Sequence, residues 1–241
     1  MPSAAMLVIG NEILSGKVVD TNSPYLAREL RALGVELERI LTIPDEVDLI
    51  ASEVKSMSES YDYVFTSGGI GPTHDDLTME GVASAFDRPL VLNANMCERI
   101  ERASGQSVNE SQKKMAMLPE GAKAIDAGDL WFPIVVVENV HVFPGIPELF
   151  QKKFESIQDR FRGERFHLKE VFVTRHESDI AEALHALLRD YPQLMLGSYP
   201  RIGETDYRVL LTLESRDPSY LESALASLLD RLPDDAIHRV S

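Results

Sequence analysis

Residues 61–85 have the sequence YDYVFTSGGIGPTHDDLTMEGVASA. The run from Tyr61 to Thr66 is rich in aromatic and β-branched residues and predicts a strand. A helical spacing of apolar residues begins after Thr78, whose hydroxyl is of the kind that caps a helix N-terminus. The segment between the strand and the helix is rich in glycine. We therefore predict a strand, a glycine loop and a helix in direct succession.

The loop has the composition of a phosphate-binding segment. Gly68, Gly69 and Gly71 permit positive φ angles and let backbone amides approach a ligand closely. The helix N-terminus that follows favours negative charge. Asp75 and Asp76 lie in the same loop, where they would repel a bare phosphate unless a metal ion or a polar group lay between them. This combination indicates chemistry as well as binding.

A simpler interpretation of the loop stays open at this point. Glycines after a strand also form ordinary turns, and carboxylates before a helix stabilise its N-terminus. The loop lacks the Gly-Lys-Ser/Thr sequence of P-loop proteins and the third glycine of the dinucleotide-binding fingerprint. Those two classes of nucleotide-binding protein are therefore disfavoured.

The composition narrows the classes of partner and compartment. A net charge of −15 over 241 residues disfavours binding to nucleic acid or to an anionic membrane, because both are bound by an excess of Lys and Arg. The single cysteine, Cys97, excludes an internal disulfide and a Cys-rich zinc site. The sequence has no signal-peptide pattern and no apolar run of membrane-spanning length. We expect a cytoplasmic protein with a small-molecule ligand.

Strand and helix patterns alternate through the first part of the chain. Strands are predicted at residues 4–9, 35–43 and 61–66, and helices at residues 22–33 and 47–58. Such alternation is typical of an α/β fold with a mostly parallel sheet that helices cover on both faces. We expect that fold for the larger part of the chain.

Two more helices, two strands and a last helix complete this part. The helices are predicted at residues 94–103 and 110–117, the strands at residues 134–137 and 141–143, and the last helix at residues 148–161. The turn between the last strand and the last helix contains proline and glycine. It therefore presents free amides at the same kind of strand end as the glycine loop.

The end of the chain has its own order of elements. Residues 166–241 predict strand, helix, strand, strand, helix and strand. This βαββαβ order is that of a small ferredoxin-like α+β domain. We therefore divide the chain into a large α/β domain, residues 1–165, and a small α+β domain, residues 166–241.

Several motifs resemble one known family. Residues 67–78, SGGIGPTHDDLT, resemble the signature of the MoaB/Mog molybdopterin-binding fold. Residues 10–16, GNEILSG, which we expect to form a loop, resemble the N-terminal domain of CinA-type proteins together with residues 20–22, DTN. Residues 140–148, VHVFPGIPE, and 196–200, LGSYP, resemble the version of this domain at the N-terminus of eukaryotic FAD synthases.

The resemblance implies a three-layer MoaB/Mog-like fold and, for the CinA and FAD-synthase branches, metal-dependent hydrolysis of FAD or ADP-ribose with release of AMP. The Mog branch implies an alternative, which is binding or adenylylation of molybdopterin. A homo-oligomer and a requirement for potassium are also implied, beside the Mg²⁺, Mn²⁺ or Co²⁺ that oxygen ligands would bind. Residues 128–133, GDLWFP, stand where many CinA-type sequences have Gly-Thr-Ala-Pro-Gly, which favours the FAD-synthase branch.

The candidate site residues follow from the loops and the resemblance together. Asp76 and Asp75 are the expected metal ligands, and with Asp45 they are the expected catalytic residues, because a divalent ion polarises a phosphoryl oxygen and activates water. Amides of the glycine loop and nearby hydroxyls are expected to hold the phosphates. The residues expected to bind the ligand are Asn11, Glu12, Ser67, Gly68, Gly69, Gly71, Pro72, Thr73, Thr78, Gly145, Pro147 and Glu148.

Some of these residues have structural alternatives. Asp45 follows Pro44 and could serve only as a turn residue and helix cap. Glu148 would stabilise the start of a helix whether or not it met a ligand. Trp131 and Phe132 could stack on an adenine or flavin ring, or could anchor the core.

Overall fold

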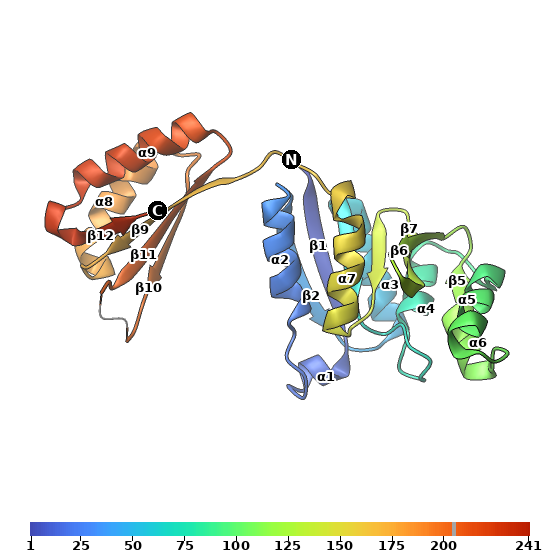
Figure 1. The fold of residues 1–241 in the computed structure, drawn as a ribbon. Helices are drawn as coiled ribbons and strands as arrows, with labels where there is room; N and C mark the ends of the chain where they lie inside the picture. The colour runs from blue at the N-terminus through green and yellow to red at the C-terminus, as the bar shows by residue number, and fades with distance from the viewer. Residues whose placement is uncertain (204–205) are drawn as a thin grey trace. The chain divides into compact units, whose positions relative to one another are not determined.

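The computed structural model describes residues 1–203 and 206–241 (Figure 1). The chain divides into two compact units, Met1–Gly163 and Glu164–Ser241. Each unit has its own cluster or clusters of buried apolar side chains, so each is described by itself below.

A six-stranded mixed sheet forms the middle layer of the first unit, in the order β2-β1-β3-β8-β7-β6. Its strands are β1 (Ser3–Ile9), β2 (Glu36–Ile43), β3 (Tyr63–Ser67), β6 (Lys123–Ala127), β7 (Leu130–Val137) and β8 (Val140–Phe143). The strands β2, β1, β3 and β8 are parallel, whereas β7 and β6 are antiparallel to their neighbours. The predicted mostly parallel α/β sheet is confirmed, with a hairpin added at one side.

Helices cover both faces of this sheet (Figure 1). They are α1 (Asn11–Leu14), α2 (Asn22–Ala32), α3 (Val47–Ser60), α4 (Thr78–Ala85), α5 (Ala94–Ser104), α6 (Glu110–Ala116) and α7 (Pro147–Ile157), with a 3-10 turn at Gln158–Arg160. One apolar cluster joins α2 and α7 to one face, and a second joins α3, α4 and α5 to the other. Successive residues of β1 alternate between them: Met6 and Val8 belong to the first cluster, and Leu7 and Ile9 to the second.

The second unit is an antiparallel four-stranded sheet with two helices. Its elements are β9 (His167–Val173), α8 (Glu177–Asp190), β10 (Met195–Pro200), β11 (Val209–Ser215), α9 (Pro218–Arg231), a 3-10 turn at Asp234–Ala236 and β12 (Ile237–Val240). The strand order β10-β11-β9-β12 is that of a split βαβ unit, which confirms the ferredoxin-like prediction. As far as the structure describes the chain, none of its helices is long and apolar enough to cross a membrane.

Short elements are where the structure departs from the sequence prediction. The segment Gly10–Gly16, expected as a loop, contains the one-turn helix α1. Three strands were not predicted: β4 (Leu90–Leu92) and β5 (Met117–Pro119), which pair with each other, and β6. Elements of three to five residues contain too few positions for a periodic pattern to be recognised.

One buried histidine lies inside the first unit. The ring of His141, on β8, stacks on Phe65 at 5.5 Å between centroids and meets the edge of Phe161 at 5.1 Å. Its exposed fraction is 8%. Burial disfavours the charged ring and lowers the pKa of His141 from 6.5 to about 4.

This burial predicts an acid-sensitive fold. As the pH falls below 6.5 the unfolded chain takes up a proton on His141, whereas the folded chain does so only near pH 4. The free energy of unfolding should therefore lose roughly 2 kcal/mol between pH 7 and pH 4.5 through this group. Urea denaturation of the wild type and of His141→Phe at both pH values measures the loss. An equal pH dependence in both proteins would contradict it.

Candidate functional site

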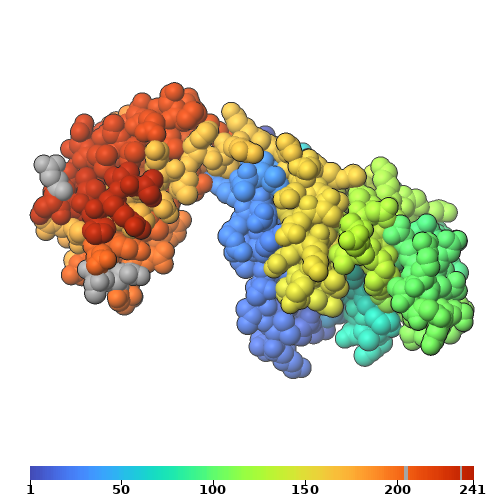
Figure 2. Space-filling model, viewed as in Figure 1, coloured from blue at the N-terminus to red at the C-terminus, as the bar shows by residue number. Residues whose placement is uncertain are grey.

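The carboxyl ends of four parallel strands meet at one edge of the first sheet. The strands β1, β2, β3 and β8 are followed there by Gly10, Pro44, Gly68 and Pro144. The amide of Gly10 donates to the carbonyl of Ile43 at 3.1 Å. In Figure 2 the α1 segment (blue) and the loop after β3 (cyan) project from the same end of this unit. Ligands of open α/β sheets bind at such an edge.

Two glycines of the loop are required by close contacts. Gly68 has φ +106°, and a Cβ added there would lie 2.2 Å from the carbonyl oxygen of Ile9. Gly69 has φ +63°, and its added Cβ would lie 2.4 Å from Oγ1 of Thr78. The loop therefore keeps its shape only with glycine at both positions.

The amides of the loop have two different roles. The Gly68 amide donates to the carbonyl of Phe143 at 3.2 Å, so it is not available to a phosphate, contrary to our expectation. The next amides, those of Gly69, Ile70 and Gly71, have no protein acceptor within residues 1–203 and 206–241. Consecutive free amides of this kind form a concavity that binds anions.

Thr78 fastens the loop to α4. We predicted its hydroxyl as the helix cap, but the cap position is Leu77, and Thr78 is the first helical residue. Its hydroxyl donates to the carbonyl of Gly68 at 2.8 Å, and its amide donates to the carbonyl of Gly69 at 2.9 Å. Thr78 is fully buried. It therefore holds the loop in place and does not face a ligand.

Asn22, the first residue of α2, joins the end of β3 to the loop after β8. Its Nδ2 atom donates to Oγ of Ser67 at 2.9 Å and to the carbonyl of Gly145 at 2.9 Å. Asn22 is 4% exposed, and Ser67 is buried beside it. We had assigned Ser67 to phosphate binding; its hydroxyl oxygen accepts this hydrogen bond, and the assignment stays a prediction. Asn22 was missed as a site residue, although it lies in the Asp-Thr-Asn motif quoted above.

A cavity of about 650 Å³ opens at this edge. Its lining comes from α1 and the segment after it, the glycine loop, α6, β7 and the start of α7. The lining residues are Glu12, Val18, Gly68, Gly69, Ile70, Gly71, Pro72, Asp76, Met115, Leu130, Trp131, Phe132, Pro144, Gly145, Ile146, Pro147, Leu149 and Lys153. The volume is that of a site for a drug-sized ligand.

The adjacent aspartates of the loop are placed differently. Asp76 lines the cavity, and its Oδ2 accepts from the amide of Thr73 at 2.8 Å and lies 2.5 Å from the Thr73 hydroxyl. Asp75 is exposed outside the lining, with its Oδ1 2.6 Å from the same hydroxyl. That hydrogen bond holds the pKa of Asp75 below its usual value. Only Asp76 is thus brought to the cavity together with the glycines.

Five other predicted residues lie around α1, the loop and α7. The carboxylate of Asp45 accepts from the amide of Asn11 at 2.8 Å, so it holds the start of α1, and neither residue lines the cavity. Glu148, in the first turn of α7, also lies outside the lining, as does Thr73. Glu12, which does line the cavity, folds its carboxylate against Gly10.

The carboxylates alone do not form a metal centre. Among the residues that the structure describes, no group of three or more His, Cys, Asp or Glu side chains is placed to hold a metal ion. Glu12 and Asp76 nevertheless line the same cavity. Mg²⁺ is often held by one or two carboxylates together with substrate phosphates. A divalent ion therefore fits this site in the company of a phosphate ligand.

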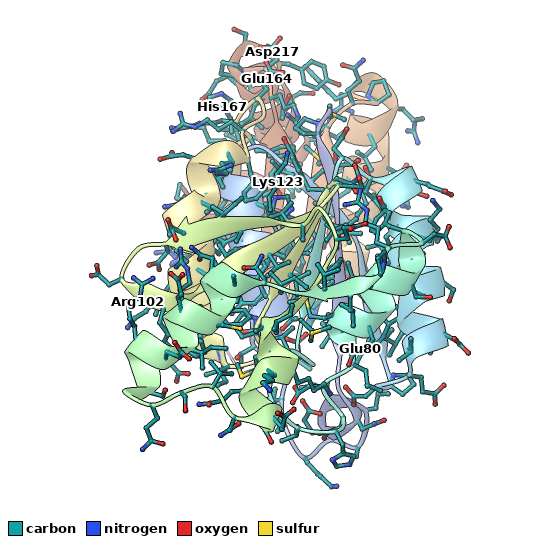
Figure 3. The ribbon with its side chains drawn as sticks, turned by 90° about the vertical axis from the view of Figure 1, so that its right-hand side faces the viewer. Glu80, Arg102, Lys123, Glu164, His167 and Asp217 are labelled. Atoms are coloured by element: carbon teal, nitrogen blue, oxygen red, sulfur yellow. The ribbon has the colours of Figure 1, made fainter. Side chains whose placement is uncertain are left out.

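Lys114, on α6, contacts the loop that contains Asp75 and Asp76. Nζ of Lys114 donates to the carbonyl of Thr73 at 2.6 Å and lies 3.8 Å from the carboxylate of Glu80 on α4. Figure 3, which labels Glu80, views the unit from the side of α5 and α6. Sequence reasoning missed Lys114, because a lysine near a helix end gives no signal of a contact 41 residues away.

Fold and cavity together define an α/β domain with a glycine loop of free amides at the strand ends and a ligand-sized cavity beside it. The chain belongs to the family described as "Probable molybdopterin binding domain", whose model matches residues 5–163. The model described as "FAD synthase, middle domain" matches residues 165–241.

Relatives are similar over most of the chain. A protein of Archaeoglobus fulgidus is 37% identical over 95% of this chain and 97% of its own length. A "Probable FAD synthase" of Caenorhabditis elegans is 30% identical over 98% of this chain, which spans only 51% of that protein. The crystal structure of the protein CinA from Thermoplasma acidophilum has a TM-score of 0.62 and 27% identity, over 67% of this chain and 99% of that one. The family resemblance is thus confirmed.

The contacts of Gly69 predict a loss of binding on substitution. Gly69→Ala should weaken binding of ADP at least roughly tenfold, because the new methyl group displaces Thr78 and the free amides with it. Gly105→Ala is the matched control, since Gly105 also has a positive φ, +69°, but nothing within 4 Å of an added Cβ. Gly105→Ala should lose about 1 kcal/mol of stability through its positive φ, and Gly69→Ala should lose more because its methyl group also meets Thr78. Calorimetric titration that found equal ADP affinities would refute the role of the loop.

Proposed function

We propose that this chain hydrolyses the pyrophosphate bond of a dinucleotide of the FAD or ADP-ribose type, with a divalent ion, and releases AMP. One observation supports the proposal most directly: the free amides from Gly69 to Gly71 and the carboxylates of Asp76 and Glu12 line the same cavity. The name of the relatives, "Probable FAD synthase", supports a ligand of the FAD type.

In the proposed hydrolysis, the loop amides and the carboxylates have separate roles. The amides from Gly69 to Gly71 bind the diphosphate. Asp76 and Glu12 would hold the divalent ion with phosphate oxygens, and the ion, when bound, neutralises their charge and activates water. That water adds to one phosphorus while the bond from this phosphorus to the bridging oxygen breaks, which yields two monophosphates, one of them AMP. Asp45 acts by position, because it holds the helix that carries Glu12.

A second candidate function is favoured by the family match over residues 5–163. It is binding of molybdopterin, or transfer of AMP from ATP to it. The same amides would bind the pterin phosphate, and the cavity would hold the pterin. This function predicts an adenylated pterin from ATP, whereas the hydrolase predicts AMP from a dinucleotide without ATP.

Substitution of Asp76 tests the proposed hydrolase activity. Purified protein is incubated with FAD or ADP-ribose and with Mg²⁺, Mn²⁺ or Co²⁺, with and without K⁺, and AMP is quantified by chromatography. Asp76→Asn should lower the rate at least roughly a hundredfold, because a neutral amide binds the ion poorly. Asp48→Asn, an exposed carboxylate in the first turn of α3, is the control and should keep the rate.

The neighbouring aspartate sharpens the same test. Asp75→Asn should have a much smaller effect than Asp76→Asn, since Asp75 lies outside the cavity lining. If the wild type released no more AMP than Asp76→Asn with any of the three ions, the hydrolase proposal would be wrong. An adenylated pterin formed from ATP in a parallel incubation would favour the second candidate.

A further inference from the structure

The carboxylate of Asp76 is held by a single residue, Thr73. The Thr73 amide donates to Oδ2 of Asp76 at 2.8 Å, and the Thr73 hydroxyl lies 2.5 Å from the same atom. Oδ1 accepts no hydrogen bond from the described part of the chain. The carboxylate lies against Gly71, where an added Cβ would be 2.7 Å from Oδ2. Asp76 therefore has one oxygen free for an ion, and its orientation depends on Thr73.

Thr73 is in turn held from outside the loop by Lys114. Nζ of Lys114, on α6, donates to the carbonyl of Thr73 at 2.6 Å. Within residues 1–203 and 206–241, this is the only hydrogen bond that joins residues 70–76 to another part of the chain. Nζ also lies 3.8 Å from the carboxylate of Glu80, which Figure 3 labels on α4. The position of Thr73 thus depends on a contact from α6.

The charge of Lys114 matters at this place because the loop carries two adjacent carboxylates. The Thr73 hydroxyl lies 2.6 Å from Oδ1 of Asp75 and 2.5 Å from Oδ2 of Asp76. A hydroxyl has one proton, so it donates to only one of these carboxylates at a time. The two negative charges also repel each other. An ammonium at the Thr73 carbonyl offsets this repulsion, which a neutral donor would not do.

We propose that Lys114 is a positioning residue for the divalent ion: by holding Thr73, it keeps Asp76 oriented to bind the ion together with the phosphates of the ligand. This inference rests on the proposed function, which assigns the ion to Asp76. Lys114 lies outside the cavity lining, so it acts through Thr73 and does not touch the ligand. Without it, the carboxylate would have to be reoriented when the ion binds, which weakens binding of the ion.

The effect of Mn²⁺ on ADP affinity measures this role without any turnover. ADP is titrated calorimetrically with Mn²⁺ present and with Mn²⁺ removed by chelation. In the wild type Mn²⁺ should raise the affinity for ADP. Lys114→Met should lose roughly tenfold of this gain, the loss expected for one hydrogen bond from a charged donor. Its affinity for ADP without Mn²⁺ should stay within about twofold of the wild type, because the free amides are unchanged.

Two further variants serve as controls for the loss of the side chain. Lys114→Arg keeps a positive charge and its donors, and should restore most of the gain. Lys113→Met removes the neighbouring lysine of α6, whose ammonium pairs with Glu110 at 2.5 Å, and should behave as the wild type.

The dependence of AMP release on ion concentration gives a second readout. In Lys114→Met the Mn²⁺ concentration for half-maximal release of AMP from FAD should rise roughly tenfold. The rate at saturating Mn²⁺ should fall much less, because excess ion compensates for weak binding. Asp76→Asn, which lacks the ligand itself, should stay slow at every Mn²⁺ concentration.

The outcomes separate this inference from the proposed function. A Mn²⁺ gain that Lys114→Met reduces and Lys114→Arg restores supports the positioning role even if no AMP is released. An equal gain in Lys114→Met and the wild type overturns it even if FAD is hydrolysed, and so does an equal loss of ADP affinity with and without Mn²⁺. A wild type without any gain overturns it together with the ion site. Should circular dichroism show Lys114→Met unfolded, Lys114→Gln, which lacks the charge, replaces it with the same expected loss.

Discussion

The site depends on a close approach of backbones at Gly68. An added Cβ there would lie 2.2 Å from the carbonyl oxygen of Ile9, and one on Gly145 would lie 3.4 Å from the Gly68 Cα atom. The ends of β1, β3 and β8 therefore meet with no side chain between them. Asn22 closes the same junction with its two hydrogen bonds. The contacts of this junction fix the position of Gly68 and so the direction of the free amides that follow it.

The cavity combines two kinds of surface that different parts of the sheet provide. The parallel strands end in glycines and carboxylates, and the antiparallel strand β7 begins at the same edge with Leu130, Trp131 and Phe132. A ligand with a charged middle and a flat apolar end matches that division. The proposed hydrolysis concerns the first surface, and the second surface is formed by other side chains of the same cavity.

Sequence patterns were sufficient for the long elements and for part of the site. Strong periodicity gave α3, α8 and α9, and the glycine spacing gave the loop that holds Asp76 near its end. The patterns could not give contacts between distant segments. Asn22 and Lys114 act across 45 and 41 residues, and nothing local to them indicates the partner. Thr78 carried the right chemistry, but its hydroxyl donates to the carbonyl of Gly68 inside the protein.

The direction of β7 places the hairpin turn between β6 and β7 next to the cavity. Because β7 runs opposite to β8, the cavity residues at the start of β7 lie directly after the tight turn that connects it to β6, near Gly128. Connecting turns tolerate insertion and substitution better than the elements that they join. Changes at the hairpin tip can therefore alter the cavity wall at Leu130 and Trp131 while the glycine loop after β3 stays the same.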